Sequence, residues 1–227
     1  MRLLGPVVKP ALLEEDGAAR SLLVVSTGLA NVGSVVNMCS RLGADVTVSD
    51  DTAEVRRAHR LLLPGVGAFD LGMETLARNG LDRALVEVAG SGRPILGICL
   101  GMQLLLDRSE EGDRCGLGLV PGVVRRLASE SHHGRVRIPH MGWSRVREEG
   151  GHPLFDGMDE ASRYYFVHSY AADPDDPTDV IGRSTHGAPF VSAVARRNVM
   201  GVQFHPEKSH RYGKALLGNF LRMDPCL

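Results

Sequence analysis

The chain has 227 residues, with 26 Lys and Arg against 27 Asp and Glu, and a formal net charge of −1. This balance offers no strong positive field to a nucleic acid, so we expect no nucleic-acid partner. Hydrophobic residues make up 43% of the chain, which excludes disorder throughout. No run approaches the roughly 18 uncharged apolar residues of a membrane span, so we expect a cytoplasmic protein with no membrane partner.

The first half of the chain alternates short apolar runs with segments of helical spacing. Four runs are predicted strands, at 22–25, 45–48, 61–63 and 94–98, the third of them stopped by Pro64 and Gly65. Apolar residues recur at helical spacing at 32–39, 52–58, 69–76 and 102–106. This alternation predicts an α/β fold, with an open, mostly parallel sheet and helices on both faces.

From Gly116 onward, short apolar segments are separated by turns. We expect them to form a smaller, mainly antiparallel β portion, at 119–124, 136–138, 144–146, 164–167, 180–182, 191–194 and 199–204. An exposed loop is predicted at 173–179, followed at the end of the chain by a helix that buries Leu216, Leu217 and Phe220. Residues 1–20 lack the features of a signal peptide, so we expect an N-terminal extension there and a single domain at 21–227.

The four cysteines show no paired CxxC spacing: Cys39, Cys99, Cys115 and Cys226. A disulfide framework, a zinc site or another metal site is therefore not expected, and we expect no cofactor.

Cys99 lies in Gly97-Ile98-Cys99-Leu100-Gly101, which matches the strand, sharp turn and helix of a nucleophile elbow, with Cys in place of Ser. Side chains at Gly97 or Gly101 would collide with neighbouring elements, and a helix N-terminus after Cys99 stabilises negative charge on sulfur. The motif predicts a cysteine nucleophile, although alone it is equally compatible with a buried structural cysteine.

A base for this nucleophile is offered by Gly201-Val202-Gln203-Phe204-His205-Pro206-Glu207, where an apolar strand ends in a His followed by a carboxylate. The His205 imidazole can take the thiol proton and return it to a leaving amine, while Glu207 holds the ring. Alone, His205 is equally explained as a loop cap and Glu207 as a solvated carboxylate. With the elbow, they predict a Cys-His-Glu triad.

A glycine-rich turn follows a predicted strand in Leu63-Pro64-Gly65-Val66-Gly67-Ala68-Phe69. Because the carboxyl ends of parallel strands line the crevice of an open α/β sheet, we expect this turn near Cys99. The amides of Gly65, Val66 and Gly67, with that of Leu100, could stabilise a tetrahedral oxyanion. The alternative is an ordinary turn between a strand and a helix.

The segments GICLGMQLL and GVQFHPEKS resemble the two signatures of class I, triad-type glutamine amidotransferases. Within that family, LPGVGAFD, PHMGW and YFVHSY are similar to the glutaminase subunits of imidazole glycerol phosphate synthase. The resemblance runs from about residue 22 to about residue 221. It implies a flavodoxin-like fold, and a reaction in which Cys99 attacks the side-chain amide of L-glutamine to give a thioester and ammonia.

The resemblance also implies which residues hold glutamine. Gln103 and Glu111 would lie beside its amino-acid head, and the backbone of His168, Ser169 and Tyr170 would receive its carboxylate. An acceptor suits an ammonium and amide donors suit a carboxylate. By itself, the pair Glu110-Glu111 is most simply a solvated face.

The implied partner is a (β/α)8-barrel synthase subunit that receives the ammonia and forms a heterodimer with this chain. By likeness, Lys208 would pair with an acidic residue at the barrel mouth, and Asn31, His140 and Trp143 would lie along the docking face. The alternatives are that Trp143 is a core residue and that Lys208 is an ordinary surface residue.

Two residues depart from the family pattern: Ala30 stands where Gly is usual, and Ser144 where Asn is usual.

The sequence is compatible with four alternative functions. The ammonia could go to a paralogous barrel that amidates a sugar, or to a chorismate-using synthase, against which PHMGW and YFVHSY argue. Outside the family, the chain could be an elbow-cysteine peptidase or glyoxalase-like protein, which the HPE segment disfavours, or a catalytically silent docking subunit, which the intact triad disfavours.

Overall fold

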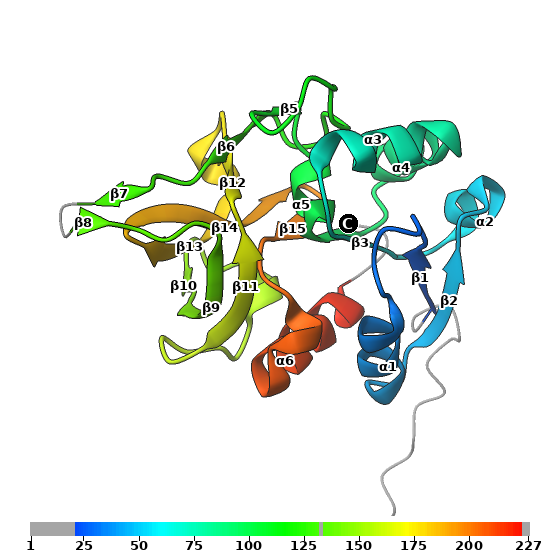
Figure 1. The fold of residues 1–227 in the computed structure, drawn as a ribbon. Helices are drawn as coiled ribbons and strands as arrows, with labels where there is room; N and C mark the ends of the chain where they lie inside the picture. Colours follow the sequence, from blue (N-terminus) through cyan, green and yellow to red (C-terminus); the bar gives the residue numbers. More distant parts are fainter. Residues whose placement is uncertain (1–20, 132–133, 224–227) are drawn as a thin grey trace, which may run out of the picture.

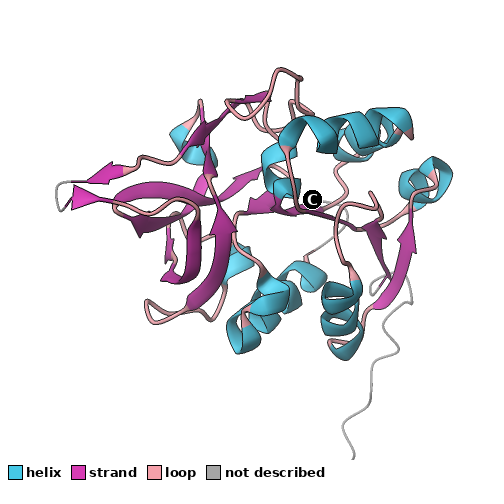
Figure 2. Cartoon of the chain, in the orientation of Figure 1, coloured by secondary structure: helices cyan, strands magenta, loops and turns pink. Residues whose placement is uncertain are grey.

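The structure, a computed structural model, describes residues 21–131 and 134–223. Figure 1 shows the order of its elements, and Figure 2 shows their type. The predicted extension at 1–20 lies outside the described residues, and the single domain over 21–227 stays a prediction.

Five parallel strands form one half of the main sheet, in the order β2-β1-β3-β4-β15. They are β1 (Ser21–Val25), β2 (Asp45–Ser49), β3 (Leu61–Gly65), β4 (Ile95–Cys99) and β15 (Val199–Val202). The prediction that Pro64 stops the third strand was wrong, because β3 continues to Gly65. Proline has no N–H to donate to a neighbouring strand. β1 pairs only with Leu61 and Leu62 of β3, so no carbonyl of β1 is left without a donor at Pro64.

Helices cover both faces of this half, as predicted (Figure 1). They are α1 (Gly33–Arg41), α2 (Thr52–Arg57), α3 (Phe69–Arg78), α4 (Leu81–Gly90), α5 (Leu100–Leu104) and α6 (His210–Arg222). The alternation of β1 sets the two layers, because Leu23 faces the core of α3 and α4 whereas Leu22 faces that of α1 and α6. Leu216, Leu217 and Phe220 of α6 are fully buried, as predicted.

Two helices differ from the prediction. No helix was predicted at α4, yet Leu81, Leu85 and Val88 lie buried on one of its faces. α5 ends at Leu104 rather than continuing to residue 106. Beyond it the backbone tightens, since the amide of residue 105 donates to Met102 O and that of residue 106 to Gln103 O.

The second half of the chain extends the sheet with mostly antiparallel strands. They are β5 (Arg108–Ser109), β6 (Gly122–Arg126), β10 (Arg147–Glu148), β12 (Tyr170–Pro174), β13 (Val180–His186) and β14 (Ala188–Arg196), of which β14 joins β15. Two further pairs stand apart: β7 (Glu130–Ser131) with β8 (Gly134–Arg135), and β9 (His140–Arg145) with β11 (Arg163–His168). Short 3-10 turns are η2 (Pro153–Phe155), η3 (Pro177–Asp179) and η4 (Pro206–Lys208). The predicted fold class is confirmed.

The predicted exposed loop at 173–179 is shorter in the structure. Asp173 and Pro174 pair with β6 as the end of β12, a strand that was not predicted. At the other end Asp179 is 6% exposed and binds Arg196, with 2.8 Å between Oδ2 and Nη1. A continuous exposed stretch remains only at residues 175–178.

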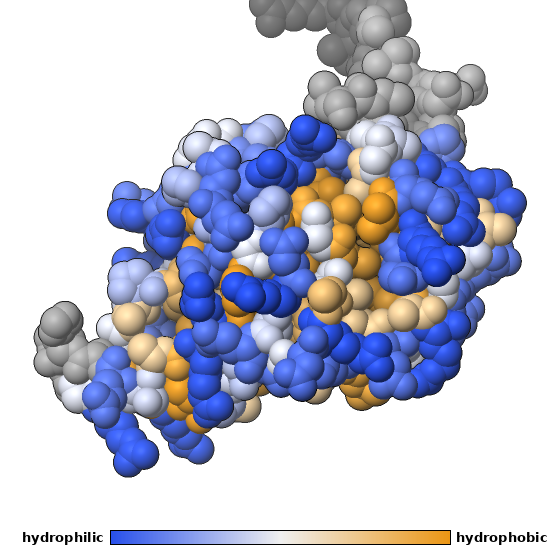
Figure 3. All heavy atoms as spheres, turned by 90° about the horizontal axis from the view of Figure 1, so that it is seen from above, coloured by the Kyte–Doolittle hydropathy of each residue, from blue (hydrophilic) through white to orange (hydrophobic). Residues whose placement is uncertain are grey.

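The surface in Figure 3 is mostly hydrophilic, with apolar side chains gathered over the middle of that face. Within 21–131 and 134–223, no helix is long and apolar enough to cross a membrane. In the same ranges, no group of three or more His, Cys, Asp or Glu side chains could hold a metal ion. Cys39, Cys99 and Cys115 are free.

Candidate active site

Cys99 lies at a sharp turn between β4 and α5, with φ 55° and ψ −111°. A positive φ is strained for a residue with a side chain, and it turns the sulfur away from the strand. A Cβ on Gly97 would come 2.6 Å from Gly101 O, and one on Gly101 would come 1.8 Å from Leu63 O. The predicted collisions at these two glycines are confirmed. α5 has only five residues, so its dipole is smaller than the sequence suggested.

His205 is the titratable side chain that faces this thiol. It is 3% exposed, and its Nδ1 lies 2.8 Å from Glu207 Oε1. Burial lowers the pKa of His205, but hydrogen bonding and charge interaction with Cys99 and Glu207 outweigh it and raise the pKa to about 9. Nδ1 is occupied by Glu207, so the ring meets the Cys99 thiol through Nε2, which has no other hydrogen-bond partner within the described ranges.

The backbone around His205 is fixed against β11. The His205 amide donates to Tyr165 O at 2.9 Å, and the Tyr165 amide donates to Ser209 Oγ at 3.0 Å. The Ser209 hydroxyl in turn donates to His205 O at 2.6 Å. This closed set of bonds orients the imidazole before any ligand binds.

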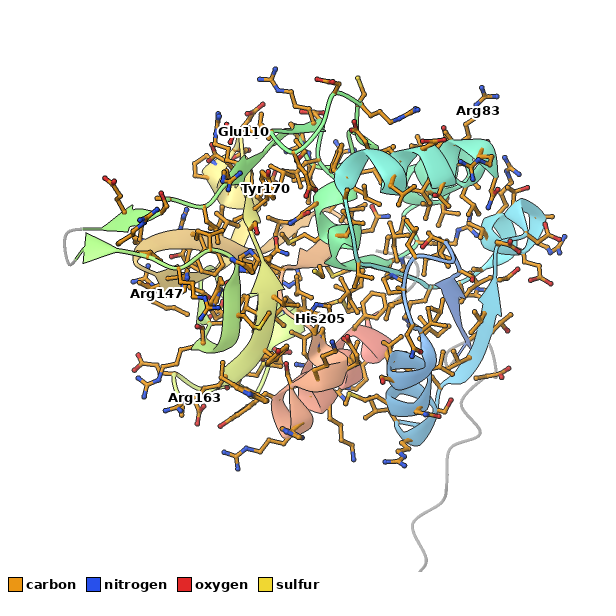
Figure 4. All side chains as sticks on the ribbon, viewed as in Figure 1. Arg83, Glu110, Arg147, Arg163, Tyr170 and His205 are labelled. Atoms are coloured by element: carbon orange, nitrogen blue, oxygen red, sulfur yellow. The ribbon has the colours of Figure 1, made fainter. Side chains whose placement is uncertain are left out.

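A cavity of about 310 Å³ opens beside Cys99 and His205. It brings together residues that the sequence predicted separately and is lined by Val66, Gly67, Cys99, Leu100, Gln103, Glu111, Pro139, Val167, His168, Ser169, Tyr170 and His205. Figure 4 shows Tyr170 and His205 toward the middle of the molecule, whereas Arg147 and Arg163 project outward.

Two residues of the predicted triad and oxyanion turn do not line the cavity. Gly65 pairs with Cys99 in the sheet, and Glu207 lies behind the imidazole of His205. A larger hollow of about 730 Å³ lies elsewhere, beside Pro94, Asn198 and Met223. It contains none of the predicted catalytic residues.

The two neighbouring glutamates have different surroundings. Glu110 is exposed and binds Arg125, with 3.1 Å between Oε1 and Nη1. Glu111 is half-buried and accepts the Phe69 amide at 2.8 Å, where α3 begins. Glu111 is thus held at the cavity rather than belonging to a solvated face.

Gln203 was not predicted as a site residue, although the structure places it against the thiol. It is fully buried, and its Nε2 lies 3.8 Å from Cys99 Sγ. Its Oε1 accepts from Gln103 Nε2 at 3.0 Å. The signal in the sequence was a lone amide between Val202 and Phe204 in an otherwise apolar run.

Trp143 and Lys208 flank Tyr165 on one surface. Trp143 is 46% exposed, which rules out a core position, and its ring stacks on His210 at 5.4 Å. Its centroid lies 6.0 Å from that of Tyr165, and Lys208 Nζ lies 5.8 Å from the Tyr165 ring. We call Met141, Trp143, Tyr165, Lys208 and His210 the aromatic face.

Asn31 is exposed before α1, which packs against η4, and its Oδ1 accepts the Gly33 amide at 3.0 Å. His140 differs from the expectation of an exposed docking residue, because its side chain is 3% exposed. Side chains alternate along β9, so His140 points away from the face that carries Trp143.

Both departures from the family pattern have a local account. Ala30 has no positive φ, so its methyl group is accommodated without backbone strain. The hydroxyl of Ser144 lies 2.9 Å from His140 Nε2, which gives it a defined partner.

The family model for class-I glutamine amidotransferases matches residues 23–223. The chain is 45% identical over 203 residues to imidazole glycerol phosphate synthase subunit HisH 2 of Pseudomonas aeruginosa, covering 89% of this chain and 99% of that one. It is also 45% identical to the HisH subunit of Sulfurimonas denitrificans, over 88% of this chain and 97% of that relative. Among solved structures, a putative GMP synthase subunit of Thermoplasma acidophilum aligns with a TM-score of 0.66 at 21% identity, over 88% of this chain and 92% of that one.

The last likeness shows the fold alone, whereas the family match and the two relatives confirm the predicted resemblance. They do not favour a peptidase or a glyoxalase-like protein. The chain belongs to the class-I glutamine amidotransferase family, among relatives of the HisH type.

Proposed function

We propose that the chain is the glutaminase subunit of imidazole glycerol phosphate synthase, acting in the cytoplasm in histidine biosynthesis. It hydrolyses L-glutamine to glutamate and passes the ammonia to a (β/α)8-barrel synthase subunit. The observation that carries the proposal is the strained Cys99 beside the buried His205 in one cavity, with Glu207 bound to the far side of the His205 ring.

The first half of the reaction forms a thioester. The thiol proton passes to His205 Nε2, whose raised pKa favours the imidazolium, and Cys99 Sγ then attacks the side-chain carbonyl carbon of glutamine as a thiolate. An imidazole with a pKa near 9 holds that proton well, and Glu207 stabilises the resulting charge. The backbone amides of Val66, Gly67 and Leu100, residues that line the cavity, stabilise the oxyanion. When the intermediate collapses, the imidazolium gives its proton to the leaving nitrogen, and ammonia departs.

The second half regenerates the enzyme. Water attacks the thioester carbonyl after giving a proton to His205 Nε2, and the same oxyanion donors stabilise the second intermediate. The C–S bond breaks, the sulfur recovers the proton, and glutamate leaves.

Glutamine is held by groups of opposite character at its head. Glu111, fixed by its bond to the Phe69 amide, accepts from the substrate ammonium. The amides of the segment 168–170 donate to the substrate carboxylate. Glu111 and the segment 168–170 line the same cavity as Cys99, so the amide end of a glutamine held by them reaches the sulfur.

The barrel subunit docks on the aromatic face, with Lys208 paired to an acidic residue of the partner. An exposed Trp beside a Tyr is the kind of anchor found at the centre of stable interfaces. Lys208 follows Glu207 directly, so the docked partner lies beside the site where ammonia is released.

The test is Cys99→Ala in the complex with the barrel subunit from the same genome. Glutamine-dependent formation of imidazole glycerol phosphate should be lost, while added ammonium should restore it, since the synthase chemistry belongs to the partner. The exposed Cys115→Ser serves as the matched control and should behave as the parent. Glutaminase activity near the parent rate in Cys99→Ala would contradict the mechanism. If the parent complex did not make imidazole glycerol phosphate, the assignment of the barrel subunit as the partner would be contradicted.

A further inference from the structure

Two buried histidines outside the triad face each other across the β9–β11 pair. His140 and His168 are 3% and 6% exposed and are directly opposite in register. Nδ1 of His140 lies 3.0 Å from Nε2 of His168. A bond between two ring nitrogens needs one proton, so one ring donates and the other accepts.

The surrounding groups show which of the two rings donates in the hydrogen bond between His140 and His168. His168 Nδ1 lies 2.8 Å from Tyr170 O, and a carbonyl can only accept, so His168 Nδ1 is the donor there. Burial is the main cause that lowers the pKa of His168 to about 3 and of His140 to about 4, so both rings are neutral. His168 Nε2 therefore accepts from His140 Nδ1, and His140 Nε2 accepts from the Ser144 hydroxyl.

The Tyr170 carbonyl joins this chain of bonds to the candidate active site. It also accepts from Gln103 Nε2 at 3.1 Å, and the same nitrogen donates to Gln203 Oε1 at 3.0 Å. Both hydrogens of the Gln103 amide are thus committed, and only its oxygen remains for a ligand. Gln203 in turn places its Nε2 against Cys99 Sγ.

We propose that His140 and His168 are positioning residues of the glutamine pocket. His168 donates to the Tyr170 carbonyl and His140 donates to His168, which fixes the 168–170 segment and the Gln103 amide in the orientation that accepts the substrate ammonium. Ser144 is the outer end of this chain of bonds. The inference rests on the proposed function, and it assigns to His140 a role inside the subunit.

The variants separate the hydrogen bond from the volume of the ring. His140→Leu fills the space beside Phe166 and Phe190 but removes the donor to His168. His140→Asn keeps an N–H donor near the position of Nδ1. His186→Phe is the control, because the His186 ring stacks on His140 at 4.2 Å but bonds to Arg137 O, outside the chain of bonds.

The probe is a diazoketone analogue of glutamine, which alkylates a cysteine nucleophile with loss of dinitrogen. Saturation kinetics on the full chain give the concentration for half-maximal inactivation and the limiting rate separately. His140→Leu should raise that concentration about tenfold, as expected for one buried donor lost, and change the limiting rate by less than about twofold. His140→Asn and His186→Phe should stay within about twofold of the parent.

A spectroscopic test addresses the direction of the bonds and does not depend on activity. With ¹⁵N-labelled histidine, His140 and His168 should show neutral rings protonated at Nδ1 at pH 7. In Ser144→Ala this pattern should persist at His168. A charged ring at either position, or a ring protonated at Nε2, would overturn the inference.

The two proposals fail in different ways. If the parent reacts with the probe and His140→Leu has the parent's two constants, only the positioning role is overturned. If the folded parent is not labelled at Cys99 and its complex does not hydrolyse glutamine, both are overturned. Circular dichroism of each variant establishes that it is folded, and the tautomers of the parent test the inference even where His140→Leu does not fold.

Discussion

Mild acid should destabilise this fold through its buried neutral histidines. Between about pH 6.5 and pH 4, the unfolded chain binds protons at His140 and His168 that the folded chain does not, because burial holds their folded pKa values near 4 and 3. Stability therefore falls as the pH falls through this window. Carboxylates with lowered pKa values, such as Asp70 and Glu87, lose their contribution only further down, near and below about pH 4.5.

The magnitude follows from these values. Going from pH 7.5 to pH 5, each of the two histidines costs about 2 kcal/mol of stability relative to an unfolded pKa of about 6.5. His205 acts in the opposite direction, because its raised pKa favours the folded state more at pH 5, by about 1.5 kcal/mol. The net prediction is a loss of about 2 to 3 kcal/mol.

Urea unfolding of the chain, followed by circular dichroism at pH 7.5 and pH 5.0, measures this loss. His140→Leu removes one of the two destabilising protonations and should therefore lose about 2 kcal/mol less than the parent over the same interval. A parent chain that is equally stable or more stable at pH 5.0 would refute the assignment of two buried neutral rings.

Three further predictions concern the elbow, the base and the docking face. Glu207→Gln should lower kcat for glutamine by about 10² to 10⁴. Because the Glu207 charge raises the pKa of His205, the pH–rate profile of the Glu207→Gln complex should show a lower pKa for His205. An unchanged profile would count against the pairing of His205 with Glu207. Gly97→Ala forces a Cβ to within 2.6 Å of a backbone oxygen and should lower the melting temperature strongly, whereas Gly90→Ala, with nothing within 4 Å, should leave it unchanged or slightly higher; equal melting temperatures would contradict the steric argument. Lys208→Ala should weaken partner binding or make the complex release more glutamate than product, and unchanged affinity with a one-to-one ratio would make Lys208 an ordinary surface residue.

The parallel half of the fold could be predicted because each strand is a continuous apolar run between turns. α4 was missed although Leu81, Leu85 and Val88 have helical spacing, since only Asn79 and the left-handed Gly80 separate it from α3. The shortness of α5 depends on turns after Leu104 that hydrophobic spacing does not encode. Asp179 was placed in an exposed loop because its burial depends on Arg196, which comes from another strand.

In the candidate site, too, some features follow from local sequence and others depend on tertiary contacts. The positions of Cys99 and His205 follow from motifs at the ends of β4 and β15, which are neighbours in the sheet, so local sequence was sufficient. Gln203 and His140 were different, because Gln203 lies just beyond the end of β15 and the role of His140 depends on which face of β9 points inward. That face is set by the pairing of β9 with β11 and by packing under the sheet, neither of which is visible in a single segment.

Mass spectrometry of the complex, quenched with acid during turnover of glutamine, tests directly whether Cys99 is the nucleophile. A γ-glutamyl thioester is expected on the peptide that contains Cys99 and not on the peptides of Cys39 and Cys115. It should accumulate in Glu207→Gln if water attack slows more than acylation. Glutamate formation at the normal rate in Cys99→Ala, or a γ-glutamyl adduct on a different residue, would contradict the assignment of Cys99 as the nucleophile.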